Sequence, residues 1–307
     1  MIVIAGDALV DLIVRADGSI TAVPGGGPYN SARAVGRLGL AVSWIGGLSS
    51  DRFGRELEAG LSGAGVDLSM AQRTELPTTL ALAEIGADGA ASYRFYTDAT
   101  SAPAVYAGPL AAGLPVDTEA VLTGTLGFVL EPMATTLEGM VTALSPDLLL
   151  MIDPNCRPSI TRDPEGFRAR LARVLARADI VKVSTEDLAF LRPGEHVNSS
   201  AAWVQSLGPR VVLITDGPAP IRVLIDGTEH QVVARTVEVV DTIGAGDTFG
   251  GAFLACLVQG GGGRHAAADT EAVLRAARFA VRASAFVCER AGANPPTLAE
   301  LGGWPTA

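Results

Sequence analysis

Residues 148–157 read LLLMIDPNCR, an apolar run that ends in a polar turn. The run is far shorter than the roughly 20 residues that a membrane helix needs. Its lack of alternation is typical of a strand that is buried on both faces, as in parallel sheets covered by helices. This stretch therefore predicts an α/β fold with a central, mostly parallel sheet.

The same pattern recurs along the chain. Short apolar runs that end in glycine or polar residues and precede helical periodicity occupy residues 2–5, 41–45, 120–122, 180–183 and 211–214. This alternation of strands and helices is typical of a doubly wound sheet. Because ligands of such sheets bind beyond the carboxyl ends of the strands, we expect the functional residues in the tails of these runs.

Two regions break this rhythm with alternating apolar and polar residues. Residues 78–85 and 91–96 predict an antiparallel hairpin around a turn at 86–89. Residues 9–16 alternate as well, and a turn leads from them to residues 20–23. We interpret these four short segments as a small second sheet. A hairpin that extends the main sheet is the alternative.

The chain organisation favours one domain over residues 1–307, with a β lid formed by about 9–23 and 78–98. No repeat with a period of about 20 to 50 residues is visible, which argues against a solenoid or propeller. The length is sufficient to bury a large core.

Composition excludes several classes of protein. A formal net charge of −10 opposes binding to nucleic acid, which needs clustered Lys and Arg. Lys182 is the only lysine, so no Walker A loop is present. The cysteines Cys156, Cys256 and Cys288 are odd in number and far apart, which fits reduced thiols in the cytoplasm. With no basic segment before the first strand and no long apolar run, we expect a cytoplasmic protein without a membrane partner.

The strongest chemical signal is DTIGAGDTF at residues 241–249. Gly244 and Gly246 let a ligand approach bare N–H groups at the start of a helix, where the helix dipole favours anions. Residues 244–246, which include Ala245, are therefore interpreted as an anion hole. Asp247 lies next to it and can accept the proton of a hydroxyl in line with a transferring phosphoryl group. An Asp that only caps the helix is the alternative.

Residues 241–247 resemble the carboxyl-terminal signature of the PfkB family of carbohydrate kinases, also called the ribokinase-like family. Residues 25–32, GGGPYNSA, followed by Leu38 and Gly39, resemble its amino-terminal signature. The resemblance extends from Gly6 to about Pro296. It implies a ribokinase-like three-layer α/β/α sandwich with a small β-sheet lid, and it implies ATP and Mg²⁺ as cofactors.

The resemblance also implies which residues bind the acceptor. Asp11 resembles the carboxylate that binds sugar hydroxyls, and Gly26, Gly27 and Asn30 resemble its partners. A carboxylate and an amide can together bind vicinal hydroxyls, which makes these residue types suitable. Arg94 belongs to a YRFY segment that resembles bacterial fructokinases, and we expect it to face the sugar from the lid.

Further residues resemble the phosphoryl and nucleotide contacts of the family. The form Asp-Pro-Asn-x-Arg at residues 153–157 resembles the branch with fructokinases and 2-keto-3-deoxygluconate kinases, and Arg157 can contact the transferring phosphate. Asp187 would hold magnesium, mainly through water. Asp241 resembles part of a site for a monovalent cation, with K⁺ as the candidate. The nucleotide contacts are assigned to Lys182, Ser184, Asp187, Thr215 and Gly217.

Together these patterns predict an ATP-dependent sugar kinase that phosphorylates a primary hydroxyl, with fructose as the first candidate substrate. The alternatives are 2-keto-3-deoxygluconate and ribose. A non-catalytic sugar- or nucleotide-binding protein of the same fold is an alternative from another class. A nicotinamide-dependent dehydrogenase is disfavoured because no G-x-G-x-x-G follows the first strand. We expect a homodimer formed through the lid, since a small sheet needs something to cover its apolar face.

Overall fold

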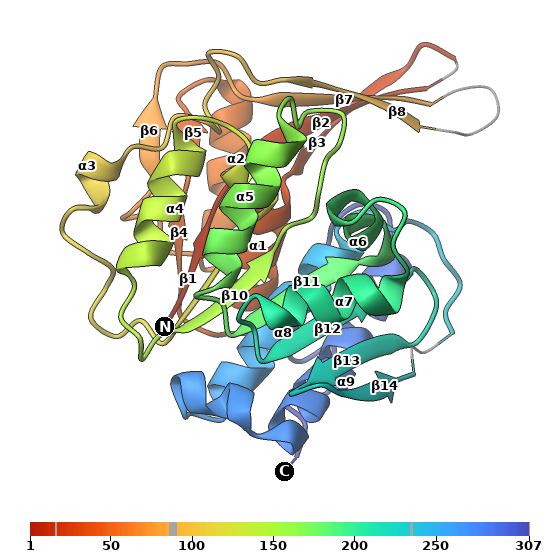
Figure 1. The fold of residues 1–307 in the computed structure, drawn as a ribbon. Coiled ribbons are helices and arrows are strands. Elements are labelled where there is room, and N and C mark those ends of the chain that lie inside the picture. Colours follow the sequence, from red (N-terminus) through yellow and green to blue (C-terminus); the bar gives the residue numbers. More distant parts are fainter. Residues whose placement is uncertain (16, 86–90, 234–235, 307) are drawn as a thin grey trace.

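The computed structural model describes residues 1–15, 17–85, 91–233 and 236–306. Its main sheet has eight strands in the order β14-β13-β12-β11-β10-β9-β1-β4 (Figure 1). The parallel strands are β1 (Ile2–Ala5), β4 (Val42–Ile45), β9 (Ala120–Gly124), β10 (Leu149–Asp153), β11 (Ile180–Ser184) and β12 (Val211–Thr215). Each predicted strand of this sheet is confirmed, with ends that differ by at most about two residues, as is usual for element boundaries.

Two further strands continue the sheet in the antiparallel direction. They are β13 (Ile221–Ile225) and β14 (Thr228–Val232), which extend the sheet from β12 to its edge. The sequence analysis did not predict them. The sheet is thus mostly parallel with an antiparallel edge, and the α/β class is confirmed.

Helices cover both faces because successive side chains of a strand point to opposite sides. Ile2 and Ile4 belong to one buried cluster, whereas Val3 and Ala5 belong to the other. The first cluster includes side chains of α1 (Gly27–Arg37), α2 (Arg52–Ser62), α8 (Ala245–Gln259) and α9 (Thr270–Cys288). The second includes α4 (Met133–Ala143), α5 (Pro164–Leu175), α6 (Thr185–Leu191) and α7 (Val197–Ser206). The shorter elements are α3 (Ala107–Leu110) and the 3₁₀ helices η1 (Thr125–Phe128) and η2 (Gly263–Ala268).

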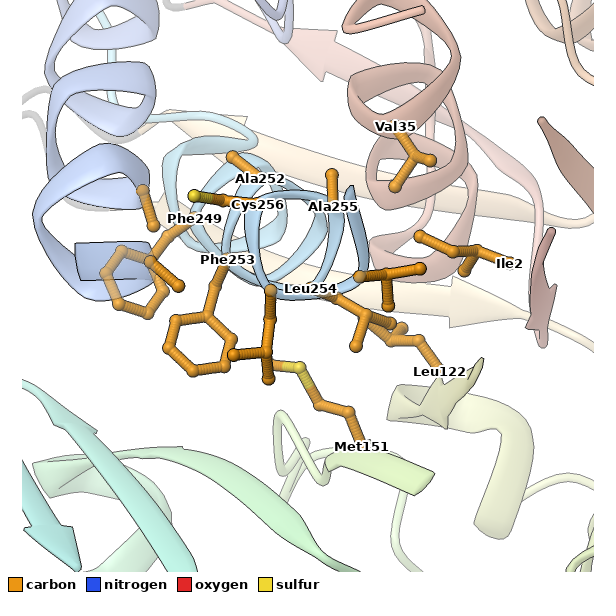
Figure 2. Close-up of a cluster of buried hydrophobic side chains, with 14 of the residues drawn as sticks. Ile2, Val35, Leu122, Met151, Phe249, Ala252, Phe253, Leu254, Ala255 and Cys256 are labelled. Atoms are coloured by element: carbon orange, nitrogen blue, oxygen red, sulfur yellow. The ribbon is translucent and has the colours of Figure 1, made fainter. Parts of the chain in front are cut away.

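The central helix α8 has little contact with solvent. Figure 2 shows Phe253 and Leu254 among side chains of the sheet such as Leu122 and Met151. Phe249 stacks on Phe253 with ring centroids 6.4 Å apart. Burying each side chain of this size contributes about 1.5–3 kcal/mol. The core therefore holds the first turn of α8 firmly at the carboxyl edge of the sheet.

A second sheet of four strands has the order β3-β2-β7-β8. It comprises β2 (Leu9–Val14), β3 (Ile20–Gly25), β7 (Leu80–Ile85) and β8 (Ala91–Tyr96), with only β2 and β7 parallel. It is separate from the main sheet, so the alternative of an extended main sheet is wrong. The predicted turn at 86–89 lies outside the described residues. In Figure 1, β7 and β8 extend away from the body of the molecule.

A short pair, β5 (Gly47–Ser49) and β6 (Gln72–Thr74), was not predicted from the sequence. Among the described residues, no helix combines the length and the apolar character needed to cross a bilayer.

Candidate active site

A cavity of about 580 Å³ lies between the four-stranded sheet and the carboxyl ends of the main sheet. Its lining brings together residues that are up to about 240 positions apart in the chain. The residues predicted from the sequence that line it are Asp11, Gly26, Gly27, Asn30, Arg157, Lys182, Gly244, Gly246 and Asp247. The strand order thus assembles most of the expected acceptor and phosphoryl contacts in one place.

Asp247 lies in the first turn of α8 and is held by the other signature segment. Its Oδ2 accepts a hydrogen bond from Asn30 Nδ2 at 2.9 Å, and its backbone carbonyl accepts one from Ser31 Oγ at 3.0 Å. Burial raises the pKa of Asp247, while the bond from Asn30 and the charges of Lys182 and Arg157 oppose the rise. A Cβ added to Gly27 would lie 3.2 Å from Asp247 Oδ1. This second oxygen therefore faces the cavity and is placed to accept a proton.

The start of α8 forms only part of the predicted anion hole. Gly244 has a φ of +74°, and a Cβ there would lie 2.5 Å from Cβ of Ala293, so the turn requires glycine. The N–H groups of Gly246 and Asp247 belong to the first helical turn, which has no intrahelical partners for them. The N–H of Ala245 instead donates to the Thr242 carbonyl at 3.2 Å. The expectation for Ala245 is corrected, because its amide already closes the turn.

A buried ion pair lies beneath this helix start. Lys182 Nζ donates to Asp153 Oδ2 at 2.7 Å, and both side chains are almost fully buried. Although burial opposes the charged amine, the carboxylate of Asp153 raises the pKa of Lys182. A Cβ on Gly246 would lie 3.5 Å from Lys182 Nζ. Lys182 therefore adds positive charge next to the free N–H groups of α8.

Arg157 supplies a second cation to the cavity. Its Nη1 donates to the carbonyl oxygens of Asn155 and Cys156, each at 3.1 Å, which fixes the guanidinium beside the end of β10. Arg157 lines the cavity together with Asp7, Asp11 and Asp247, and its charge opposes the rise in their pKa values that burial causes.

The four-stranded sheet contributes Asp11 to the cavity. Burial first, and then the charge of Asp247, raise the pKa of Asp11 to about 6. A Cβ on Gly25 would collide with Asp11 Oδ2, so the bare glycine lets this carboxylate lie flat against β3. Ile13 of the same strand and Tyr93 and Phe95 of β8 also line the cavity. The acceptor side thus combines one carboxylate with an apolar wall.

The expectation that Arg94 faces the acceptor is wrong for this chain. The register pairs Arg94 with Leu82, whereas Phe95 pairs with Ala81, which in turn pairs with Asp11. Since side chains alternate along a strand, Arg94 lies on the opposite face from Asp11 and is exposed. The inward positions of β8 are aromatic.

Of the residues predicted for the nucleotide, Lys182 lines the cavity. The others lie at or just after the carboxyl ends of β11 and β12, outside the lining, and are Ser184, Asp187, Thr215 and Gly217. Ser184 and Thr215 are register partners, and Gly217 follows in an open turn with a φ of +50°. Ser184 caps α6, and its hydroxyl accepts the N–H of Asp187 at 3.0 Å. The contact of these residues with the nucleotide stays a prediction.

The carboxylate of Asp187 forms backbone contacts that the sequence did not predict. Its Oδ2 accepts the N–H of Ser184 and its Oδ1 accepts the N–H of Cys156, at 2.7 and 2.6 Å. The side chain is buried, and both oxygens are engaged by backbone donors. This carboxylate joins α6 to the turn after β10, and its contact with magnesium through water stays a prediction.

Asp241 likewise joins two loops. Its Oδ1 accepts the N–H of Ile243 at 3.0 Å and its Oδ2 accepts that of Gly292 at 2.8 Å. Within the described parts of the chain, no group of three or more His, Cys, Asp or Glu side chains could hold a metal ion.

Sequence reasoning missed several residues of the cavity. Asp7 is fully buried, and burial raises its pKa to about 7. Thr125 and Asn155 line the cavity from the ends of β9 and β10, and Tyr93 and Phe95 line it from β8. Asp7, Thr125 and Asn155 each follow a predicted strand closely, so their place in the strand tails was the available signal.

Similar proteins agree with this geometry. Residues 1–300 match the family described as pfkB family carbohydrate kinase. A fructokinase of Rhizobium leguminosarum bv. trifolii is 33% identical over 262 residues, covering 84% of this chain and 79% of the relative. Fructokinase-1 of Zea mays is 30% identical over 98% of this chain and 96% of its own. A crystal structure of fructokinase with bound ATP from Xylella fastidiosa is 27% identical, with a TM-score of 0.89 over 98% of this chain and 96% of that one. This chain therefore belongs to the PfkB family of carbohydrate kinases.

Proposed function

We propose that this protein transfers the γ-phosphoryl group of ATP to a primary hydroxyl of fructose. The observation that carries the proposal is Asp247, which is partly buried in the first turn of α8 with one oxygen held by Asn30 and the other facing the cavity. The fructokinase relatives support fructose as the acceptor.

In the proposed reaction, the acceptor hydroxyl gives its proton to Asp247 Oδ1 while its oxygen attacks the γ-phosphorus. The bond between that phosphorus and the bridging oxygen breaks, and ADP leaves. The N–H groups at the start of α8, Lys182 and Arg157 stabilise the charge on the transferring group. Magnesium enters with ATP and neutralises charge on the phosphates.

The charges of the cavity favour a neutral acceptor. Its lining holds three carboxyl groups, Asp7, Asp11 and Asp247, against the two cations Lys182 and Arg157, and Lys182 is already paired with Asp153. The four-stranded sheet supplies aromatic side chains where Arg94 was expected. A carboxylate on the acceptor would meet like charges there. This favours fructose or ribose over 2-keto-3-deoxygluconate. Tyr93 and Phe95 offer an apolar surface to the carbon face of a sugar.

We extend the proposal to the action of the lid and to assembly. The four-stranded sheet would close over the sugar and exclude water, which competes as an acceptor. Ile20 is 64% and Tyr96 49% exposed on this sheet, and β3 and β8 are its edge strands. Exposed apolar residues on an open edge favour pairing with a second copy, so we propose a homodimer through the lid.

The proposal also includes a monovalent cation and a cellular location. A potassium ion beside Asp241 would connect the signature loop with the loop at Gly292, which this carboxylate already joins. A cytoplasmic location fits a reaction that consumes ATP, and it fits three free cysteines.

The test is ADP release from ATP and magnesium with fructose, ribose, 2-keto-3-deoxygluconate, glucose, tagatose and adenosine, beside a control without acceptor. We expect fructose to stimulate release most strongly and 2-keto-3-deoxygluconate to have little effect. Stimulation by another acceptor alone would reject fructose and retain the kinase. ATP binding without release in any mixture would favour the non-catalytic alternative.

A further inference from the structure

Thr125 adopts a backbone conformation that its residue type disfavours. Its φ is +52°, in the left-handed region that β-branched residues rarely enter. Such a conformation is unfavourable and persists only where the surroundings enforce it. The strain is therefore a reason to ask what the Thr125 side chain does.

The surroundings hold Thr125 from both sides. Gly124 before it has a φ of +157°, and a Cβ there would collide with the carbonyl of Asp153. Leu126 after it donates its N–H to Asp7 Oδ1 at 3.1 Å. Asp7 is itself fully buried, so the turn is fixed to the end of β1. The side chain of Thr125 consequently has a defined direction.

That direction leads to the catalytic carboxylate. A Cβ on Gly27 would lie 2.6 Å from Thr125 Oγ1, 3.2 Å from Asp247 Oδ1 and 3.3 Å from Asn155 Nδ2. These three polar atoms therefore surround the bare face of Gly27, and all four residues line the cavity. No hydrogen bond to the Thr125 hydroxyl is present among the described residues, and the cavity that Thr125 lines gives a ligand access to it.

Asn155 is fixed in a comparable way. Its φ is +39°, and Asn tolerates this region better than Thr does. Its carbonyl accepts from Arg157 Nη1, and the next residue, Cys156, donates its N–H to Asp187 Oδ1 at 2.6 Å. Two buried carboxylates, Asp7 and Asp187, thus stabilise the turns that present Thr125 and Asn155.

Thr125 Oγ1, Asp247 Oδ1 and Asn155 Nδ2 form a polar cradle at Gly27. The valence of a reacting hydroxyl determines how many hydrogen bonds it can form with this cradle. The oxygen has one proton and two lone pairs besides its bond to carbon. If the proton goes to Asp247 Oδ1 and one lone pair attacks the γ-phosphorus, the other lone pair can accept one hydrogen bond. Of the two free groups, Thr125 Oγ1 lies closer to the bare face of Gly27.

We propose that Thr125 is a further catalytic residue, whose hydroxyl donates to the reacting oxygen of the acceptor while Asn155 closes the third side of the cradle. This inference rests on the proposed function. In the step, the acceptor O–H bond breaks and its proton goes to Asp247, the new O–P bond forms, and the bond from phosphorus to ADP breaks. Thr125 keeps its own proton and fixes the angle of attack.

The test compares Thr125→Val, which keeps the shape and the β-branch, with Thr125→Ser, which keeps the hydroxyl. Thr123→Val is the matched control, because Thr123 lies two residues earlier in β9, is fully buried and has a hydroxyl without a partner. We expect Thr125→Val to lower kcat about 10- to 100-fold with KM for fructose changed less than about threefold. Thr125→Ser and Thr123→Val should stay within about threefold of wild type for kcat.

Gly27→Ala tests the cradle itself. The added Cβ would meet the Thr125 hydroxyl, so sugar-dependent ADP release should be lost while ATP binding, measured by calorimetry, is kept. Gly139→Ala is the control, since Gly139 lies in α4 with open space around its Cα.

Each outcome either supports or overturns the role of Thr125. A Thr125→Val enzyme with wild-type kcat would overturn the role of Thr125 and leave the proposed function standing. A loss confined to KM would overturn it too, because Thr125 would then bind a hydroxyl that does not react. A wild-type protein that releases no ADP with any sugar would reject the proposed function and the inference together.

Discussion

The two sides of the candidate active site differ in burial. We call the carboxyl edge of the main sheet, with the start of α8, the floor, and the four-stranded sheet the upper sheet. On the floor, Asp153 and Lys182 are almost fully buried and form an ion pair at 2.7 Å. Beside them, Asn30 holds Asp247 in the partly buried first turn of α8. The upper sheet contributes Asp11, yet Ile20 and Tyr93 on it are 64% and 53% exposed. Buried contacts restrict motion more than exposed ones do.

This difference separates two tasks. Phosphoryl transfer needs donors that are already in position, and a packed floor provides them. In the proposed function, recognition of the acceptor would rely on the four-stranded sheet, whose open edges would let it move as the sugar enters. Changes to the floor should therefore reduce kcat, whereas changes to the upper sheet should mainly raise KM.

The largest effect is expected from Asp247→Asn on the floor. The variant loses the proton acceptor, so kcat should fall by about 10³-fold or more. Asn can keep the contact with Asn30, and removal of a buried charge should leave the melting temperature near that of wild type. Steady-state ADP release and thermal unfolding check this. A rate near that of wild type would remove Asp247 from the role of base.

Asp11→Asn makes the same Asp-to-Asn change in the upper sheet that Asp247→Asn makes in the floor. Because the carboxylate is expected to accept hydroxyls of the sugar, KM for fructose should rise about 10- to 100-fold, with a smaller change in kcat. Initial rates over a range of fructose concentrations measure both. If kcat fell as much as it does in Asp247→Asn, the separation of the two regions would be wrong.

Asp7→Asn tests how burial of a carboxyl group in the floor affects the pH dependence of the unfolding free energy. The native pKa of Asp7 is raised from 3.8 to about 7, chiefly by burial. The folded state then binds a proton that the unfolded state has released, so this group's contribution to stability is lost as pH rises from about 4 to 7. Relative to wild type, the variant should gain on the order of 2 kcal/mol in unfolding free energy between pH 5 and pH 8.

Urea unfolding of both proteins at the two pH values gives this difference. Asp187→Asn is not a suitable control, since both of its oxygens bind backbone N–H groups. Asp17→Asn is suitable, because Asp17 is exposed and distant from the cavity. An equal gain in both variants would show that the effect does not come from burial of Asp7.

The smallest effects are expected within strand β8. Phe95→Ala removes an inward aromatic and should raise KM for fructose about 3- to 10-fold. Arg94→Ala, one position away on the other face, should leave KM within about twofold of wild type. A larger effect of Arg94 than of Phe95 would mean that the outer face of this sheet reaches an acceptor site, for example across a dimer.

Much of the fold could be predicted because the signals are local. The strand at 148–152 is recognisable from its own residues, and DTIGAGDTF places glycines and Asp247 within one helical turn. A glycine turn, a helix start and an adjacent carboxylate have nearly the same geometry wherever they occur. The α/β class, the carbohydrate kinase family and the position of Asp247 followed from the sequence on these grounds.

The tertiary structure alone decided which face and which neighbour each side chain has. Strand alternation separates Arg94 from Phe95, but only the register with Ala81 and Leu82 showed which of them faces Asp11. Asp187 has a suitable residue type for magnesium, yet the turn after β10 engages both of its oxygens. Thr125, Asn155 and Gly27 come together because strands far apart in the sequence end at one edge of the sheet. Local residue pattern determines backbone shape, whereas convergence of distant side chains depends on strand order and register, which no short stretch of sequence contains.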